Sequence, residues 1–317
     1  MNPAPVPGNL IQVAGLCKRF GAGTVVNRLA LGVRAGEIFG LVGPDGAGKT
    51  TVVRMLAGVL RPDGGSIVID GVDVGADPER ARRHLSYMPQ RFGLYEDLTV
   101  DENIRFYADL FEVERRTWRA RADQMLAACG LTEFRGRLVG KLSGGMKQKV
   151  GLTCSLVHTP RILLLDEPTT GVDPVSRREF WQLLYGLRAE GVAILIATAY
   201  LDEAERCDRL ALMSEGAVLM SDTPAALKAR MPGLIVEVLS PQPRAVRDAL
   251  AGLPGVLGVL VVGIGAHIHL DQRGRMPQME ERLRGAGVTV ERIREVAPTV
   301  EDLFVAALAA PAERTAA

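Results

Sequence analysis

The sequence has no long apolar run and almost no excess charge of either sign. Its longest apolar candidate, residues 256–266, falls far short of the roughly 20 residues that a membrane-spanning helix needs. If the protein serves a membrane, another chain must therefore supply the spanning part. The formal net charge is +1 at pH 7, which argues against a global basic field for nucleic acid.

The chain is also poor in cysteine. Cys17, Cys129, Cys154 and Cys207 are scattered, without C-x-x-C spacing or an accompanying histidine cluster. This pattern disfavours a metal site and a disulfide framework, and it suits buried thiols in a reducing compartment. Residues 1–10 are proline-rich, with neither the basic region nor the apolar core of a signal peptide. We therefore expect a cytoplasmic protein.

Short apolar runs alternate with helical patterns over the first two thirds of the chain. Residues 38–42, 162–165 and 192–197 lack polar alternation, which is typical of parallel strands buried on both faces. Between residues 91 and 160 the pattern turns helical, which indicates a helical subdomain inserted into an α/β domain. The charge run at residues 114–121 within it is interpreted as a solvated helix face rather than a binding patch.

The pattern changes near residues 231–233, where we place the boundary between a domain of residues 1–231 and an accessory domain of residues 232–317. The second part reads as βαββαβ, the order of a small α+β ferredoxin-like unit. We expect a closing helix at residues 300–309 and a disordered tail at residues 311–317. The predicted elements are 234–239 (strand), 244–253 (helix), 256–262 (strand), 267–270 (strand), 276–285 (helix) and 288–294 (strand).

A glycine-rich segment fits G-x-x-x-x-G-K-[ST] between an apolar run and the helical residues 51–60. Glycines let backbone N–H groups wrap a phosphate, and the following helix directs its positive end at the same anion. Lys49 is expected to reach the β- and γ-phosphates of a nucleotide, and the Thr50 hydroxyl to bind Mg²⁺. The predicted cradle comprises Gly43, Pro44, Asp45, Gly46, Ala47, Gly48, Lys49, Thr50 and Thr51.

Two carboxylates end the apolar run at residues 162–165. Asp166 lies where α/β sheets place ligand chemistry, and we expect it to hold Mg²⁺ directly or through water. Glu167 is expected to orient or deprotonate an attacking water. The pair is a weak signal alone and a strong one beside a phosphate-binding loop.

The segment Leu142-Ser143-Gly144-Gly145-Met146 decides the family. It resembles the LSGGQ signature of ABC ATPases, with Met146 in place of the usual Gln, and the resemblance extends over about residues 10–230. It implies a P-loop NTPase fold, ATP and Mg²⁺ as ligands, and ATP hydrolysis. By resemblance, Phe20 stacks on adenine.

Two further residues are assigned by the same resemblance. Gln90 matches the Q-loop glutamine, which takes part in catalysis and in holding the metal, and Asp173 matches the D-loop. Taken alone, Phe20 suits a core position and Asp173 a turn before Pro174.

The resemblance implies that the signature also acts across a dimer. Ser143 can cap the helix expected at residues 146–157, and with Gly144 and Gly145 it forms an anion site. By resemblance, that site covers the γ-phosphate bound on an opposite subunit. The C-terminal part looks like the ABC-2 subgroup, whose ATPases drive export of drugs, antibiotics or polysaccharides. This implies integral membrane permease partners, a second ATPase subunit and a location at the inner face of the cell membrane.

One position departs from the family pattern. Where the family has a histidine that contacts the γ-phosphate, this chain has Ala199, which can neither donate a hydrogen bond nor carry charge. Three interpretations stay open: a slow site that pairs with a histidine-bearing ATPase, a homodimer in which Tyr200 or water substitutes, and a loss of little consequence because Glu167, Lys49 and Gln90 suffice.

The leading functional prediction is the ATP-hydrolysing motor subunit of an ABC-2 exporter. One alternative is a soluble ABC protein that acts on ribosomes or DNA, although such chains usually carry two ATPase halves or a long coiled coil. Another is a nucleotide-gated partner that scarcely turns ATP over.

Overall fold

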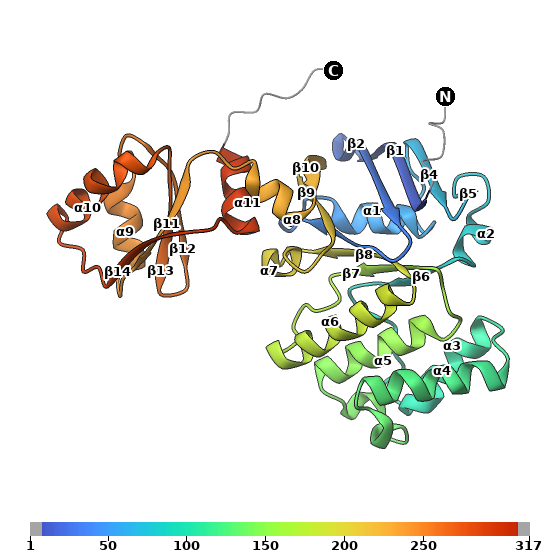
Figure 1. The fold of residues 1–317 in the computed structure, drawn as a ribbon. Helices are drawn as coiled ribbons and strands as arrows, with labels where there is room; N and C mark the ends of the chain where they lie inside the picture. The colour runs from blue at the N-terminus through green and yellow to red at the C-terminus, as the bar shows by residue number, and fades with distance from the viewer. Residues whose placement is uncertain (1–7, 310–317) are drawn as a thin grey trace. The chain divides into compact units, whose positions relative to one another are not determined.

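The computed structural model describes residues 8–309; the predictions for the extreme N-terminus and for a disordered tail at 311–317 lie outside the described residues. The chain divides into two compact units, which are described separately (Figure 1). The first comprises the described residues up to Tyr200 together with Cys207–Leu219. The second comprises Leu201–Arg206 and the described residues from Met220 onward.

A six-stranded sheet forms the centre of the first unit, in the order β10-β9-β3-β8-β7-β6; the end of β10, after Leu219, belongs to the second unit. The run at residues 38–42 forms β3 as predicted, and β3 pairs in parallel with both β8 and β9. The predicted fold class, an α/β P-loop architecture, is confirmed. The strands are β3 (Ile38–Val42), β6 (Leu85–Met88), β7 (Ile162–Asp166), β8 (Ala193–Thr198), β9 (Arg209–Ser214) and β10 (Ala217–Asp222).

Both faces of this sheet are buried, because successive residues of each strand point to opposite sides. Phe39 and Leu41 pack in one core with α1 (Lys49–Leu56). Ile38 packs in a second core with α5 (Gly144–Leu156) and α6 (Pro174–Ala189). The unbroken apolar runs of the sequence are the consequence of this two-sided burial.

A second, antiparallel sheet of the first unit has the order β2-β1-β4-β5, and the sequence pattern did not predict it. The pairing of β1 with β2 contains several register shifts. Such irregularities interrupt the period-two alternation by which a strand is recognised. The strands are β1 (Asn9–Phe20), β2 (Gly23–Arg34), β4 (Gly64–Ile69) and β5 (Val72–Asp73).

The predicted helical subdomain follows β6. Its three main helices share a core that includes Ile104, Leu126 and Val150. Thr99 and Glu102 form a reciprocal capping box at the start of the first of these helices. The helical segments are α2 (Pro78–Arg82), which precedes β6, then α3 (Val100–Leu110), α4 (Arg115–Ala128), η1 (Thr132–Phe134), η2 (Val139–Lys141) and α5.

The second unit contains the predicted βαββαβ order. Its four strands form one antiparallel sheet in the order β12-β13-β11-β14, which is the ferredoxin-like arrangement. Short helices α7 and α8 precede it. The elements are α7 (Leu201–Ala204), α8 (Pro224–Ala229), β11 (Leu234–Leu239), α9 (Pro243–Leu250), β12 (Val256–Val262), β13 (Gly265–Leu270), η3 (Arg273–Arg275), α10 (Met276–Gly285), β14 (Arg292–Val296) and α11 (Val300–Ala309).

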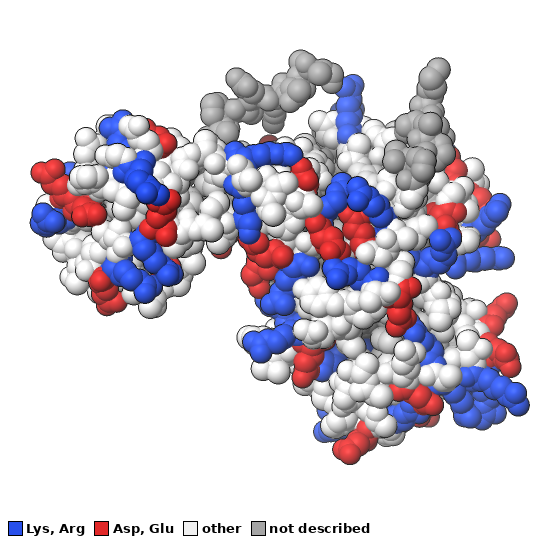
Figure 2. All heavy atoms as spheres, in the orientation of Figure 1, with Lys and Arg blue, Asp and Glu red and all other residues white. Residues whose placement is uncertain are grey.

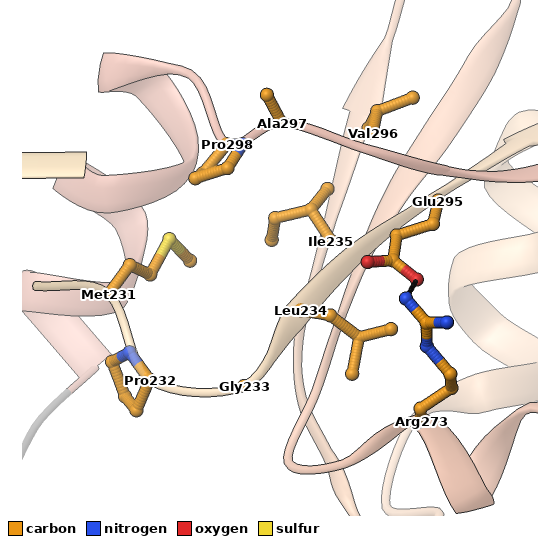
Figure 3. Close-up of a pocket in the computed structure, with 10 residues that line it drawn as sticks. All are labelled: Met231, Pro232, Gly233, Leu234, Ile235, Arg273, Glu295, Val296, Ala297 and Pro298. Carbon is orange, nitrogen blue, oxygen red and sulfur yellow. Dashed lines mark hydrogen bonds and ion pairs between the residues drawn. The ribbon is translucent and has the colours of Figure 1, made fainter. Parts of the chain in front are cut away.

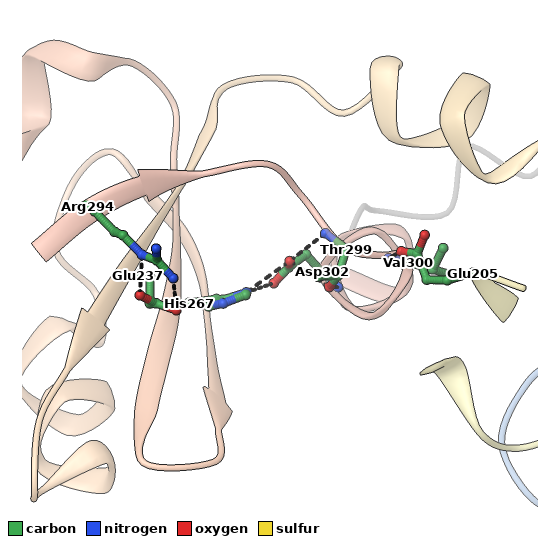
Figure 4. A network of polar contacts seen from close by, with 7 residues as sticks. All are labelled: Glu205, Glu237, His267, Arg294, Thr299, Val300 and Asp302. Carbon is green, nitrogen blue, oxygen red and sulfur yellow. Dashed lines mark hydrogen bonds and ion pairs between the residues drawn. The ribbon is translucent and has the colours of Figure 1, made fainter. Parts of the chain in front are cut away.

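A polar network fixes the start of α11 in the second unit (Figure 4). Thr299 and Asp302 hydrogen-bond reciprocally, and the His267 Nδ1 atom lies 2.9 Å from Asp302 Oδ1. Glu205 accepts the Val300 N–H at 2.9 Å. These contacts satisfy N–H groups that a helix start otherwise leaves without partners.

The second unit also has a hollow of about 460 Å³ beside the start of β11 and the end of β14 (Figure 3). An ion pair between Arg273 and Glu295 borders it. Within residues 8–309, no helix is long and apolar enough to cross a membrane.

Candidate functional site

The glycine-rich loop lies between β3 and the N-terminus of α1, as predicted. Two of its glycines are required by space: a Cβ on Gly43 would lie 2.1 Å from the Met213 carbonyl oxygen, and one on Gly48 would lie 2.5 Å from that of Val25. Gly48 also has φ +99° at the N-cap of α1, a conformation that L side chains rarely adopt. The loop is therefore tightly confined and aims the positive end of α1 outward.

The Lys49 ammonium lies at the centre of this loop. It donates hydrogen bonds to the carbonyl oxygens of Gly43 (2.8 Å) and Pro44 (3.1 Å). It also forms an ion pair with Glu167, with 3.1 Å between Nζ and Oε1. Both side chains are buried. The cation is thus held in place between the glycine-rich loop and Glu167.

Asp166 is buried at the C-terminal end of β7. Its carboxylate accepts hydrogen bonds from Thr50 Oγ1 (2.9 Å) and from the Tyr87 hydroxyl (3.4 Å). Burial raises the pKa of Asp166 above its ordinary value, and the neighbouring Glu167 carboxylate adds to the rise. Two oxygen atoms that can coordinate a cation, one from a hydroxyl and one from a carboxylate, therefore lie close together at this point.

Glu167 follows directly with a left-handed backbone, φ +53°. Its N–H donates to the Ala197 carbonyl at 2.8 Å, and its Oε2 accepts the Thr170 hydroxyl at 3.1 Å. With Lys49 on Oε1, both carboxylate oxygens have partners. This unusual backbone conformation in a non-glycine residue turns the carboxylate toward the phosphate loop.

A cavity of about 200 Å³ brings much of the predicted site together. Gln90, which follows β6, reaches it from a different element than the loop does. The lining residues are Val25, Asp45, Gly46, Gly48, Lys49, Thr50, Thr51, Gln90 and Glu167. Val25 was not predicted; no short motif marks it, because it comes from the antiparallel sheet.

The signature and the D-loop segment form a second cluster in the same chain. Ser143 caps α5 by accepting the Met146 N–H at 3.3 Å. A Cβ on Gly145 would lie 2.4 Å from Ser176 Oγ and 3.4 Å from Asp173 Oδ2. The start of α5 therefore contacts the start of α6. None of Ser143, Gly144, Gly145 or Asp173 lines the cavity at the phosphate loop.

Asp173 is the N-cap of α6. Its carboxylate accepts the N–H groups of Ser176 (2.9 Å) and Val175 (3.1 Å), and Pro174 follows at the first helical position. The Ser176 bonds hold the pKa of Asp173 below its ordinary value. Asp173 is therefore the residue at which a helix starts, and its D-loop assignment stays a prediction.

Ala199 lies immediately after β8, beside the phosphate loop. The Thr198 carbonyl accepts the Gly43 N–H at 3.3 Å, so the first glycine of the loop adjoins this position. The neighbouring Tyr200 carries the Arg177 guanidinium 4.3 Å from its ring centroid. The structure therefore places the residue that departs from the family pattern next to the loop itself.

Phe20 ends β1 and is 53% exposed, so it is not a core residue. The Lys18 ammonium lies 5.5 Å from the centroid of its ring. Phe20 does not line the cavity at the phosphate loop. An exposed ring at the end of a strand is compatible with stacking, which stays a prediction.

Comparison with known proteins agrees with this geometry. The family model described as "ABC transporter" matches residues 26–170. The "Probable multidrug ABC transporter ATP-binding protein YbhF" of Escherichia coli is 44% identical over 300 residues, which are 93% of this chain and 51% of that protein. The "Nod factor export ATP-binding protein I" of Rhizobium sp. is 37% identical over 298 residues, 93% of this chain and 95% of that protein.

This chain belongs to the ATP-binding proteins of the ABC transporter family. A solved "Structure of ATP binding subunit of ABC transporter" is 30% identical, with a TM-score of 0.64, and covers 70% of this chain and 92% of that one. The chain spans about half the length of the first curated relative that it matches.

Proposed function

We propose that the protein binds and hydrolyses ATP as the motor subunit of an ABC-2 type membrane exporter. The observation that carries the proposal is the convergence of Lys49, Thr50 and Glu167 on one cavity at the helix N-terminus. A phosphate chain fits this arrangement, because backbone N–H groups, a cation and the helix dipole all favour an anion there.

The donor set also fits Mg²⁺. Thr50 Oγ1 and Asp166 Oδ1 are 2.9 Å apart, and hydroxyl and carboxylate oxygens are the ligands that this ion prefers. Burial already disfavours the ionised form of Asp166, so a nearby cation would offset that cost. Thr50, Asp166 and Gln90 are the proposed ligands. When bound, the ion neutralises phosphate charge.

Glu167 is proposed to act on the attacking water as a general base or as a positioning group. Its carboxylate is held by Lys49 and Thr170, and its backbone is turned toward the loop. Lys49 is proposed to bind the β- and γ-phosphates, in place of some of its present acceptors.

A second ATPase subunit is proposed to complete the site. Ser143, Gly144 and Gly145 begin α5, and Asp173 lies against them, away from the residues that line this chain's own cavity. This cluster suits the γ-phosphate bound by a partner. Ala199 favours a partner with the missing histidine, with slow turnover at this chain's own site.

A membrane permease is the proposed mechanical partner, and the inner face of the cell membrane the proposed location. Named relatives include Nod factor export and daunorubicin resistance ATP-binding proteins. After Gln90, the segment that includes α3 presents exposed Tyr95 and Phe106. An aromatic surface of this kind suits a protein partner.

The test is phosphate release from ATP by the purified chain with Mg²⁺, together with purification of the chain from detergent-solubilised host membranes. Recovery of an integral membrane protein and a histidine-bearing ATPase supports the exporter with an asymmetric pair. A membrane protein alone favours a homodimer. Recovery only with ribosomes or nucleic acid overturns the transport role.

A further inference from the structure

The corner between α3 and α4 carries an arginine cluster that the site does not use. In Figure 2 the Lys and Arg atoms gather over this end of the helical subdomain, at the lower right. For the charge run at residues 114–121, which lies in this region, the sequence alone favoured a solvated helix face. A hollow of about 170 Å³ lies at this corner, lined by Arg105, Asp109, Val113, Arg115, Trp118 and Arg119.

The charges around this hollow are unbalanced. Of the four charged residues that line it, Arg105 pairs with Asp109 at 3.4 Å, and the other two, Arg115 and Arg119, are both basic. Among the described residues, neither of these two forms an ion pair, and the Arg119 guanidinium lies 5.5 Å from the Trp118 ring centroid. By contrast, Arg121 of the same helix pairs with Glu190 at 2.9 Å.

The local helix makes this imbalance greater. The first turn of α4 contains Arg115 and Arg116 and no acidic residue, and Glu114 makes no side-chain capping bond. Cations are unfavourable at a helix N-terminus, where the partial charge is already positive. An anion held by Arg115 and Arg119 would relieve both the repulsion and the helix-end charge.

Apolar side chains lie beside the arginines at the same corner. Leu110 is 60% exposed and Phe111 is 41% exposed at the end of α3. Arginines combined with exposed Leu and Phe are the surface composition that binds the interface of an anionic membrane.

We propose that the α3–α4 corner binds the phosphate of an anionic phospholipid at the membrane surface. The guanidinium groups of Arg115 and Arg119 hold the phosphate, and Leu110 contacts the acyl boundary. This inference rests on the proposed location at a membrane, and it adds a contact that this chain makes with the lipid itself.

The experiment is flotation of the full-length chain with vesicles of phosphatidylcholine alone or with added phosphatidylglycerol. Binding is expected only with phosphatidylglycerol, and it should weaken as salt is added. The double variant Arg115→Glu, Arg119→Glu should lose at least about 25-fold in apparent affinity, since each basic residue near such a surface contributes roughly fivefold. Arg115→Gln, Arg119→Gln should lose less.

The matched control is Arg244→Glu, Arg284→Glu, which changes net charge equally at two exposed helix arginines of the second unit. It should bind like the wild type. Equal binding to both vesicle types, no binding to either, or equal losses in both double variants would overturn the proposal. So would complete displacement by inorganic phosphate at matched ionic strength, which would assign the hollow to a free phosphate, or preference for RNA over vesicles.

Nucleotide affinity, measured on every variant, separates this proposal from the function on which it rests. A variant that binds ATP like the wild type is folded, so its loss of flotation reports on the lipid contact itself. A wild-type chain that floats with anionic vesicles but neither binds nor hydrolyses ATP would contradict the proposed function and leave the lipid contact standing.

Discussion

Lys49 and Glu167 form a buried ion pair, with 3.1 Å between Nζ and Oε1. The cation proposed for phosphate binding is thus held by the carboxylate proposed to act on water. We expect Glu167→Gln to retain ATP binding and to lower turnover by about 10²–10⁴-fold, the usual contribution of a general base. Phosphate release and a fluorescence titration of nucleotide measure the two effects. Thr170→Ala, which removes the bond to the other oxygen, should be milder; equal losses would argue that Glu167 only needs to be positioned.

Ala199→His should raise ATP turnover. The position adjoins Gly43 of the phosphate loop, and a group that contacts transition-state charge is worth about 10²–10³-fold in rate. Steady-state hydrolysis by the purified chain is the measurement. Tyr200→Phe is the control, because it keeps the ring against Arg177 and removes only the hydroxyl. A normal wild-type rate that Ala199→His leaves unchanged contradicts the slow-site interpretation, and a fall in Tyr200→Phe favours substitution by Tyr200.

Gly145→Ala should destabilise the contact between α5 and α6. The added Cβ would lie 2.4 Å from Ser176 Oγ and 2.5 Å from Ser176 Cβ, and such overpacking typically costs about 1–3 kcal/mol. Ser176→Gly should restore stability in the double variant. Ser176→Ala should not, since its Cβ remains. Gly144→Ala, whose Cβ would meet nothing closer than 3.7 Å, serves as the neutral control. Urea unfolding measures all four, and an unchanged midpoint for Gly145→Ala refutes the steric argument.

Asp166→Asn should stabilise the ligand-free chain. Burial raises the pKa of Asp166, so its ionised form lowers stability above the folded-state pKa, and this penalty vanishes as pH falls through that pKa. The gain in Tm should therefore be largest at neutral to alkaline pH and shrink as pH falls toward the ordinary pKa range of a carboxyl group. Asp173→Asn should behave oppositely, because the Ser176 bonds lower the pKa of Asp173 and its ionised form stabilises the fold. A lower Tm for Asp166→Asn at neutral to alkaline pH contradicts this account.

How far the sequence predicts the fold depends on whether an apolar pattern comes from a strand or from a loop. Residues 38–42 are β3 and residues 256–262 are β12, because unbroken apolar runs bounded by glycine mark such strands well. The last strand is different. Residues 288–294 read as a strand, whereas β14 is Arg292–Val296. Val288 and Val290 pack against the core from a loop and imitate the alternation of a strand.

The candidate site could be predicted from the sequence only where a short motif marks its residues. Lys49, Asp166 and Glu167 were predicted because they belong to short motifs whose residue types and spacing indicate phosphate and metal binding. Val25 and Tyr87 reach the site from other strands, and nothing local in the sequence distinguishes them from ordinary core residues. The crowding of Gly145 by Ser176 is likewise invisible before the two helices are placed together.

The bond from the Val300 N–H to Glu205 has a consequence for protein engineering. Residues 201–206 follow Tyr200 directly in the sequence, but they belong, with α8 and α11, to the second unit. Lys228 of α8 pairs with the same glutamate at 2.6 Å. A chimera that exchanges only the residues after 231 would replace α11 and keep the glutamate that holds its start. A transplant that keeps this bond must also include residues 201–206. The second unit therefore cannot be exchanged intact as one C-terminal segment.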